Sequence, residues 1–366
     1  MARWGRAAAV AVLLLTGTAT AETPWVWDLP AWVPRPRVPA DNPMTVEKVA
    51  LGRQLFYDTQ LSLKGKGACA TCHIQAKAFT DGRPVGIGVT GEKHVRNSMG
   101  LANVAYVPVL TWANPLLHSL EQQALVPMFG EHPVELGLAG QEEALFARLN
   151  ADPRYPPLFK AAFPAQDGAI SLRSITQALA SFQRSITSFN SPYDRYRYGG
   201  EASAISPAAK RGEALFFSER LECFHCHGGI TFSNAVTHER MAFVEAGFHQ
   251  TGLYNIDGKG SYPANNPGAV EVTGQPVDMG RFRTPSLRNV AVTAPYMHDG
   301  SIPTLDAVLD HYARGGRAKS TQTDQLIVGF ALSIQERADL IAFLRSLTDQ
   351  RLLTNPAYGP PGTGVR

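Results

Sequence analysis

The sequence has little of three things that would point to common classes of protein. Its 366 residues carry a formal net charge of only +3 and no basic cluster, so we expect no nucleic-acid partner. Beyond the first residues, no apolar run approaches the length that crosses a bilayer, so we expect no membrane span. Alternation of apolar and polar residues is also scarce, which predicts little β structure.

Cysteine is scarce as well, and its placement is the most informative feature of the chain. There are four cysteines, and all of them lie in two copies of Cys-x-x-Cys-His, at residues 69–73 and 223–227. This spacing is typical of c-type haem attachment, in which both thiols bond to the porphyrin edge and the histidine binds the iron. A zinc knuckle or a redox pair is the alternative, but two copies that use every cysteine favour two covalent haems. The predicted attachment residues are Cys69, Cys72, His73, Cys223, Cys226 and His227.

The first 21 residues have the pattern of a secretory signal peptide. Arg3 and Arg6 precede an apolar run over residues 7–15, and Ala19-Thr20-Ala21 resembles a cleavage site. We therefore predict cleavage after Ala21 and a periplasmic protein, since this kind of haem attachment takes place outside the cytoplasm. A retained amphipathic anchor is the alternative.

The two halves of the chain repeat one arrangement. A short amphipathic pattern with a glycine near its start and aromatic residues at its end precedes each motif, over residues 51–57 and 210–217. A longer helical pattern closes each half, over residues 171–189 and 335–347. Glycine permits close helix crossing, as expected where a helix packs near a haem. We predict a mainly α protein of two cytochrome-c-like domains, each with one covalent c-type haem and little β structure.

The expected organisation follows from these patterns. Residues 22–43 hold six prolines and three tryptophans, so this segment should run extended rather than helical. Its tryptophans either pack on the body or offer an aromatic contact to a partner. The full prediction is a signal peptide (1–21), the extended segment (22–43), an N-terminal cytochrome c domain (44–195), a linker within 190–207, a C-terminal cytochrome c domain (205–350) and a tail (351–366).

Three functional classes remain for a periplasmic protein with two haems. It could carry electrons, reduce peroxide, or oxidise another macromolecule. The feature that separates them is an open axial position on one iron with acid–base groups above it, because electron carriers close both positions.

From about residue 42 to residue 347 the chain resembles the bacterial dihaem cytochrome c peroxidase and MauG family. The residues that carry the resemblance are Leu51–Asp58, Cys69–His73, Ala78–Asp81, Arg96–Ser98, Gln122–Ala124, Pro127–Met128, Pro133–Glu135, Phe282–Val290 and Ala294–Gly300. Within the family the chain is most similar to the MbnH-type dihaem enzymes, which oxidise a tryptophan of a partner protein to kynurenine. That likeness rests on Trp27–Pro30, Asp41–Met44, Leu110–Pro115 and Gly130–Gly137.

The resemblance implies that the haem on His73 is the five-coordinate, peroxide-reactive one. The family places a glutamine and a glutamate over its open face, and these fall on Gln123 and Glu135. A positioned glutamate there moves a proton between the peroxide oxygens. His94, His118 and His132 are close in sequence, and any of them could line this site or bind in the sixth position.

The second haem, on His227, is six-coordinate in this family. Peroxidases supply a methionine as the second ligand, whereas MauG and its relatives supply a tyrosine, which corresponds to Tyr312. A phenolate stabilises ferric and higher-valent iron better than a thioether does. Met297 and His311 are the alternative ligands.

The resemblance assigns three further features. Trp112 matches the tryptophan that carries charge between the haems. Asn97 and the backbone carbonyls of Thr293 and Pro295 match the ligands of a calcium ion, and oxygen ligands suit that hard cation. One position departs from MauG: its surface tryptophan two residues before the second motif is Leu221 here. The resemblance therefore does not assign the residue through which oxidising equivalents leave the protein. The candidates are Trp25, Trp27, Trp32, Tyr254 and Tyr262.

We accordingly expect an enzyme that uses hydrogen peroxide to form a high-valent dihaem state, which oxidises a secreted partner protein at a tryptophan side chain. The first alternative is a cytochrome c peroxidase that takes electrons from a small redox protein. The second is a plain dihaem electron-transfer cytochrome.

Overall fold

The computed structural model describes residues 22–362, so the expected signal peptide and the last four residues lie outside the described residues. The described chain is helical with almost no strand, as predicted, and none of its helices is long and apolar enough to cross a membrane. The α-helices of the first half are α1 (Val46–Tyr57), α2 (Cys69–Cys72), α3 (Leu120–Phe129), α4 (Glu142–Ala151), α5 (Tyr155–Ala162) and α6 (Leu172–Ser185). Those of the second half are α7 (Pro192–Arg197), α8 (Pro207–Phe216), α9 (Cys223–Cys226), α10 (Val270–Thr273), α11 (Leu305–Ala313), α12 (Ile334–Ser346) and α13 (Gln350–Thr354).

Shorter elements connect these helices. The only sheet of the described chain pairs the two-residue strands β1 (Phe248–His249) and β2 (Phe282–Arg283) in antiparallel fashion. Single 3-10 turns occupy Thr59–Leu61, Leu63–Gly65, Gln75–Lys77, Val104–Tyr106, Pro164–Gln166, Pro276–Asp278 and Val290–Val292. Much of the chain around the two motifs is therefore irregular.

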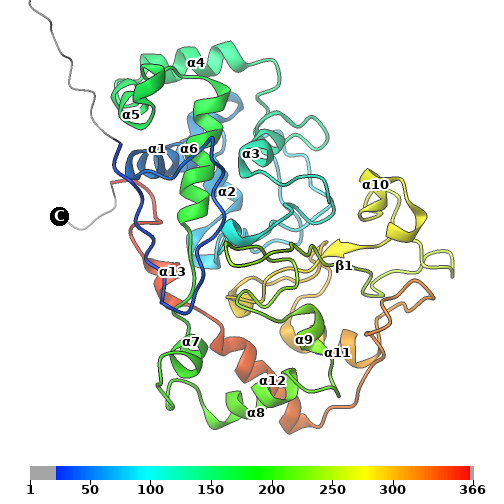
Figure 1. Ribbon diagram of the computed structural model, residues 1–366. Helices are drawn as coiled ribbons and strands as arrows, with labels where there is room; N and C mark the ends of the chain where they lie inside the picture. Colours follow the sequence, from blue (N-terminus) through cyan, green and yellow to red (C-terminus); the bar gives the residue numbers. More distant parts are fainter. Residues whose placement is uncertain (1–21, 363–366) are drawn as a thin grey trace, which may run out of the picture.

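The two halves lie end to end and repeat one helix pair (Figure 1). In the first half α1 packs across α6, and in the second α8 packs across α12. Capping side chains set where these helices begin: Thr45 caps α1, Ser171 caps α6, Ser206 caps α8 and Ser333 caps α12.

A glycine sits at each helix crossing, as the sequence predicts. A Cβ atom added to Gly52 of α1 would lie 1.9 Å from the Ala178 carbonyl oxygen of α6. A Cβ added to Gly212 of α8 would lie 2.0 Å from the Asp339 carbonyl oxygen of α12. Both distances are too short for any side chain, so each pair can pack this closely only because the residue is glycine.

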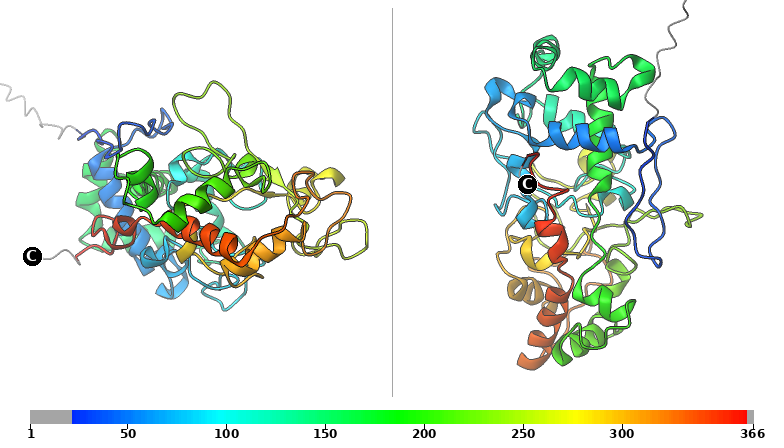
Figure 2. Two further views of the ribbon diagram at one scale, coloured as in Figure 1. Left: turned by 90° about the horizontal axis from the view of Figure 1, so that it is seen from below. Right: turned by 90° about the vertical axis from the view of Figure 1, so that its left-hand side faces the viewer.

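Each half has its own cluster of buried apolar side chains. The first core draws on residues 44–186 together with Leu352 and includes Phe56, Phe79 and Phe182, while the second draws on residues 193–347 and includes Phe232 and Phe343. The N-terminal segment contains no helix and runs along one side of both halves, as the dark blue trace in Figures 1 and 2 shows.

Two details differ from the sequence prediction. The last helix of the first half ends at Ser185 rather than near Phe189. Ile186 and Phe189 continue the apolar period but are buried in two different clusters, so their burial does not require a helix. The expected linker contains α7, which begins at Pro192 behind the capping residue Ser191 and buries Tyr193 in the second core.

The C-terminal segment returns to the first half. After α12 the chain forms α13, and Leu352 is buried in the first core. The side-chain amide of Gln75 donates to the carbonyls of Leu352 (2.9 Å) and Asn355 (2.8 Å), and the Tyr57 hydroxyl donates to the Tyr358 carbonyl (2.7 Å). The part of the predicted tail that the structure describes is thus packed against the other domain.

Candidate functional site

Each Cys-x-x-Cys-His motif folds into one helical turn with the histidine at its end. The His73 amide donates to the Cys69 carbonyl (3.1 Å), and the His227 amide donates to the Cys223 carbonyl (2.9 Å). All four cysteines are free thiols. The turn keeps two thiols and one imidazole together at each motif, which is the donor set that covalent haem attachment requires.

A backbone carbonyl orients the imidazole in both motifs. His73 Nδ1 donates to the Phe79 carbonyl (2.8 Å), and His227 Nδ1 donates to the Phe232 carbonyl (3.0 Å). These bonds place the proton on Nδ1 and leave Nε2 as the nitrogen able to bind iron. Burial lowers the pKa of both imidazoles, to about 4 for His227, so they stay in the neutral form that ligates metals.

The two carbonyls come from residues with the same unusual backbone. Phe79 has φ 65° and Phe232 has φ 53°, both in the left-handed region. This shared backbone conformation is not among the features predicted from the sequence. The available signal was a phenylalanine followed by threonine or serine, six residues after His73 and five after His227.

A cavity of about 300 Å³ opens beside the second motif. Its walls include Cys223, Cys226, His227, Tyr312 and Met297. Tyr312 is half-buried, and burial of its phenol, followed by the nearby Cys226 and Cys223 thiols, raises its pKa. A cavity lined by both thiols, the histidine and a phenol fits a c-type haem.

The two alternative ligands of the second haem differ in their surroundings. Both ring nitrogens of His311 contact the backbone: Nε2 lies 2.9 Å from the Thr251 carbonyl, and Nδ1 accepts from the Arg317 amide (3.1 Å). Met297 lines the cavity together with Tyr312. The surroundings therefore favour Tyr312 or Met297 over His311, and the choice between these two is still a prediction.

Glu135 lies at the first motif. Its carboxylate is close enough to raise the pKa of the Cys69 and Cys72 thiols further, although burial is the larger cause for both. Burial also raises the pKa of Glu135 itself, to about 7. His94 Nδ1 lies 3.8 Å from Glu135 Oε1, so of the three nearby histidines this one meets the glutamate.

A second carboxylate is buried at the same motif. Asp81 is almost fully buried, and its charge acts on Cys72, His73 and His94. Its Oδ2 atom has no hydrogen-bond partner within residues 22–362. Because a buried carboxylate oxygen needs a donor, this orphaned atom fits a site that a bound group completes.

The backbone of the Glu135 loop is tightly held. The Val89 amide donates to the Glu135 carbonyl (2.8 Å), and the Leu63 amide donates to the Leu136 carbonyl (2.7 Å). A Cβ on Gly88 would lie 1.8 Å from the Val134 carbonyl oxygen. The glycine therefore permits the close approach that positions Glu135.

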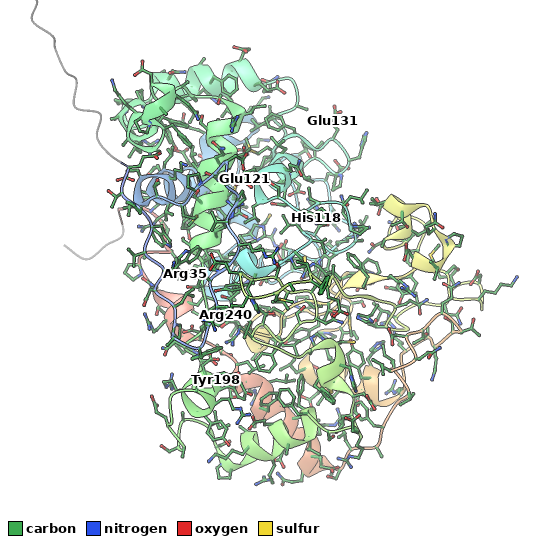
Figure 3. The ribbon with its side chains drawn as sticks, in the orientation of Figure 1. Arg35, His118, Glu121, Glu131, Tyr198 and Arg240 are labelled. Atoms are coloured by element: carbon green, nitrogen blue, oxygen red, sulfur yellow. The ribbon has the colours of Figure 1, made fainter. Side chains whose placement is uncertain are left out.

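The other predicted residues of the first site are more dispersed. Gln123 is half-buried on α3, and its side-chain amide has no hydrogen-bond partner in the described part of the chain. His118 Nδ1 lies 3.0 Å from the Pro108 carbonyl, and the His132 side chain is exposed. In Figure 3 His118 lies below Glu121 and Glu131 on the α3 side of the molecule. The role of Gln123 stays a prediction.

Trp112 and the predicted calcium ligands lie around the cavity at the second motif. The indole of Trp112 donates to the Asn97 carbonyl (2.8 Å), and the walls of the cavity include Trp112, Asn97, Thr293 and Pro295. The Asn97 amide nitrogen donates to the Arg83 carbonyl (2.8 Å), which leaves its side-chain oxygen as the potential metal ligand. The structure thus brings these residues to one cavity, and calcium itself stays a prediction.

Leu221 and two candidate exit tyrosines lie inside the second half. Leu221 is only 4% exposed and belongs to the second core. Tyr262 is buried and accepts a hydrogen bond from the Leu253 amide, whereas the Tyr254 hydroxyl donates to Asp299 (2.5 Å). The Leu221 position is therefore not available as a surface relay.

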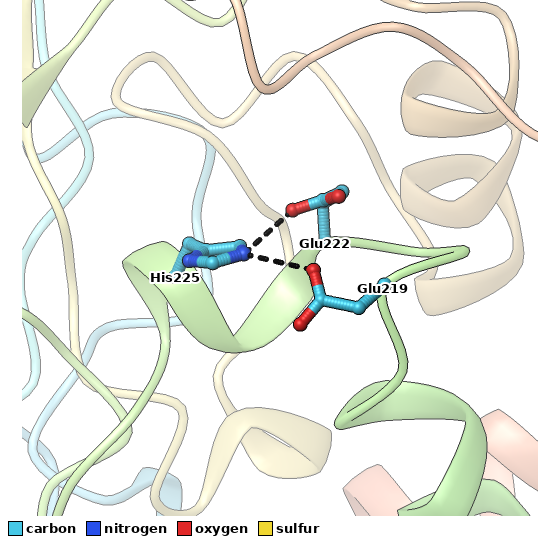
Figure 4. Close-up of side chains that lie close together, drawn as sticks. All are labelled: Glu219, Glu222 and His225. Atoms are coloured by element: carbon cyan, nitrogen blue, oxygen red, sulfur yellow. Dashed lines mark ion pairs between the residues drawn. The ribbon is translucent and has the colours of Figure 1, made fainter.

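A small polar cluster lies beside the second motif (Figure 4). His225 Nε2 lies 2.7 Å from a Glu222 oxygen and 3.6 Å from a Glu219 oxygen. Glu222 and His225 are three residues apart, and pairs of this kind on a protein surface add little stability.

Comparison with known proteins agrees with this geometry. A family model described as di-haem cytochrome c peroxidase matches residues 46–203, and one described as RoxA-like, cytochrome c-like matches residues 281–317. The chain is 37% identical to a cytochrome-c peroxidase, IdrP1, of Pseudomonas sp. (strain SCT), with 96% of this chain and 94% of the relative covered. It is 36% identical to the methylamine utilization protein MauG of Methylophilus methylotrophus, with 92% and 94% covered.

Solved structures give the same result. The crystal structure of a MauG-like protein associated with microbial copper homeostasis matches with a TM-score of 0.89 and 48% identity, over 92% of this chain and 99% of that one. The diheme peroxidase BthA from Burkholderia thailandensis shares the fold, with a TM-score of 0.66 and 21% identity over 87% and 91% of the two chains.

Proposed function

The chain belongs to the di-haem cytochrome c peroxidase family, and from that premise we propose that it uses hydrogen peroxide to oxidise a side chain of a secreted partner protein. It is a haem-dependent oxidoreductase with two c-type haems. The proposed target is a tryptophan, and the proposed compartment is the periplasm, reached through the N-terminal signal sequence.

The observation that carries the proposal is the half-buried phenol of Tyr312, which lines the cavity at the second motif. The phenol lies near the Cys223 and Cys226 thiols in this cavity, so it would be available to bind a haem attached there. An anionic phenolate stabilises oxidised iron more than a methionine thioether does. This ligand therefore suits a centre that holds oxidising equivalents for a slow protein substrate, rather than one that only accepts electrons.

Glu135 is the proposed proton carrier at the first site. The haems supply the redox chemistry, in which peroxide is reduced and oxidising equivalents are kept until the partner is oxidised. As a carboxylate, Glu135 can accept a proton from the near oxygen of peroxide and return it to the far oxygen, which then leaves as water. A pKa of about 7 suits this exchange at neutral pH, because the group can both accept and release the proton.

Trp112 and the calcium ligands are proposed to support communication between the sites. The Trp112 indole donates to the backbone carbonyl of Asn97. The backbone amide of Asn97 in turn donates to the His298 carbonyl of the second half (2.8 Å). An ion held by Asn97, Thr293 and Pro295 would stiffen this junction between the halves.

The test is mass spectrometry of candidate partners after treatment with the haem-loaded protein and peroxide. Secreted proteins whose amounts respond to copper are the first to examine, since the MauG-like relative is associated with copper homeostasis. Oxygen added at a tryptophan of one partner, only when both peroxide and the enzyme are present, is the expected result. Unmodified partners would count against the proposal.

The second candidate is peroxide reduction with electrons from a small redox protein. The observations that favour it are the likeness to IdrP1, named a cytochrome-c peroxidase, and the position of Met297 on the cavity wall. Rapid peroxide turnover with reduced cytochrome c, without modification of any partner, would place this function first.

A further inference from the structure

An aromatic pair at the surface joins the N-terminal segment to α7. Trp32 stacks on Tyr198, with ring centroids 3.9 Å apart and planes inclined by 16°. The edge of Trp32 meets Phe189 at 5.7 Å. Tyr198 is 46% exposed, and in the view of Figure 3 it lies on the same flank as Arg35 and Arg240. The pair thus has one side at the surface and the other against buried aromatic residues.

Arg288 connects this pair with the interior. Its guanidinium lies 5.9 Å from the Trp32 ring, 4.7 Å from Phe189 and 5.7 Å from Phe232. Both of its terminal nitrogens donate to Asp194 (2.8 and 3.0 Å), and the two side chains are at most 2% exposed. The carboxylate offsets the positive charge, which would otherwise oppose removal of an electron from the adjacent indole.

The contacts of Arg288 extend to the neighbourhood of His227, the histidine of the second motif. The Phe232 carbonyl accepts the hydrogen bond from His227 Nδ1 (3.0 Å), and the Ile230 carbonyl accepts one from Arg288 Nε (2.6 Å). These two carbonyls are two residues apart in the loop that follows His227. A continuous series of packed groups therefore runs from His227 through Phe232 and Arg288 to Trp32.

We propose that the Trp32–Tyr198 pair is the surface electron-transfer site through which electrons from the partner protein enter the chain. The proposal rests on the proposed function. The oxidised group is a tryptophan side chain of the partner, which gives up two electrons, one at a time, releases two protons to solvent and forms one bond to an oxygen atom supplied by water. The reduced group is peroxide, whose O–O bond breaks as it takes up two electrons and two protons to form two waters. Trp32 loses and regains an electron in each step and forms no bond.

The other aromatic candidates fit less well. Trp25 and Trp27 pack against the first core, away from His227. Leu221 is buried and not aromatic. Tyr254 contacts the cavity-lining His298 at 6.4 Å and is hydrogen-bonded to Asp299, so it is the strongest competitor and serves as a comparison variant.

The first experiment maps self-oxidation of the haem-loaded protein by peroxide without a partner. Oxidised peptides should contain Trp32 and Tyr198, and an organic radical should appear by electron paramagnetic resonance. In Trp32→Phe both signals should fall, and the return of the haem spectrum to its resting form should slow about tenfold. Trp27→Phe, a half-buried tryptophan of the same segment, should behave as wild type. Oxidation concentrated at Tyr254, and lost in Tyr254→Phe, would overturn the proposal.

A second experiment tests the route without peroxide. The two haems are reduced, and a photogenerated ruthenium(III) trisbipyridine oxidant in solution withdraws electrons from the surface. Oxidation of the His227 haem should slow about tenfold in Trp32→Phe and be unchanged in Trp27→Phe. Tyr198→Leu removes an exposed ring without touching either core and should slow the reaction as well. Equal rates in all variants would refute the route even if peroxide chemistry proceeds, whereas dependence on Trp32 without partner oxidation would refute only the proposed function.

Discussion

Glu135 is the residue whose removal should affect peroxide chemistry most directly. In Glu135→Gln the proton transfer during O–O cleavage is lost, so the reaction with peroxide should slow by roughly 10²-fold, the usual range for a missing acid–base group. Stopped-flow absorbance after peroxide addition measures this rate. Haem content should match wild type, and an unchanged rate would remove Glu135 from the mechanism.

The same residue predicts a pH dependence. Burial raises the pKa of Glu135 to about 7. Only the ionised carboxylate can accept the peroxide proton, and this form is lost as the pH falls below that pKa. The rate of the peroxide reaction should therefore fall as the pH drops through about 7 and rise above it. Glu135→Gln should lack this inflection. A wild-type profile that is flat between pH 6 and pH 8 would contradict the assignment.

Tyr312 separates the two leading functions. Tyr312→Met replaces an anionic ligand by a neutral one, so the reduction potential of the His227 haem should rise and partner oxidation should fall. Peroxide turnover with an external electron donor could then persist. Redox titration of wild type, Tyr312→Met and Tyr312→Phe measures the change. If all three titrate alike, Tyr312 is not a ligand, and Met297 becomes the leading candidate.

For individual residues, the sequence predicts which side chains attach the haems better than it predicts which groups orient them. The attachment residues are contiguous because two thiols and a histidine must meet one porphyrin, so spacing alone reveals them. The carbonyls of Phe79 and Phe232 that orient the histidines could not be found this way, because every residue has a carbonyl. Only the left-handed backbone at both positions makes them distinct.

Among the elements, the two helix crossings give a matched pair of variants. Gly52→Ala and Gly212→Ala each place a methyl group within 2.0 Å of a backbone carbonyl, so we expect each to destabilise its own half by about 1–3 kcal/mol or more, as overpacking does. Hydrogen exchange should show the loss in α1 and α6 for the first variant and in α8 and α12 for the second. Uniform loss across both halves would contradict independent crossings.

Helix positions were predictable where local chemistry decides them. Both glycine crossings and the long helices near 171 and 335 follow from residue spacing, and in the structure the caps Ser171 and Ser333 set where these two helices begin. The end of α6 was not, because Ile186 and Phe189 satisfy a helical period while they are buried in separate clusters. Periodicity reports that a side chain is buried but not against which partner.

Over the whole molecule, the C-terminal segment ties the second half to the first. Leu352→Ala removes a fully buried side chain from the first core and should cost about 2–5 kcal/mol, as large-to-small core changes do. Hydrogen exchange in α1 and α6 should rise although the substitution lies beyond the second half. Thr354→Ala, an exposed change in the same helix, is the control and should have little effect. Increased exchange confined to α8 and α12 would argue against this coupling.

The duplication of the fold was visible in the sequence, but this return was not. The two motifs and their flanking helices repeat along the chain, so two similar halves follow directly. The contacts of Leu352 and Tyr358 with the first half depend on where the second half delivers the chain in space. No local pattern in residues 350–360 records that position.

The return of the last residues also sets an order of maturation. A chain that is synthesised and, as proposed, exported N-terminus first presents the first motif long before Leu352 arrives, so the first core stays incomplete until Leu352 has been delivered. Chains that stop early lack the segment that closes this core and remain open to proteases. The half that contains the first motif is therefore completed last, which ties its assembly to delivery of the chain through Leu352.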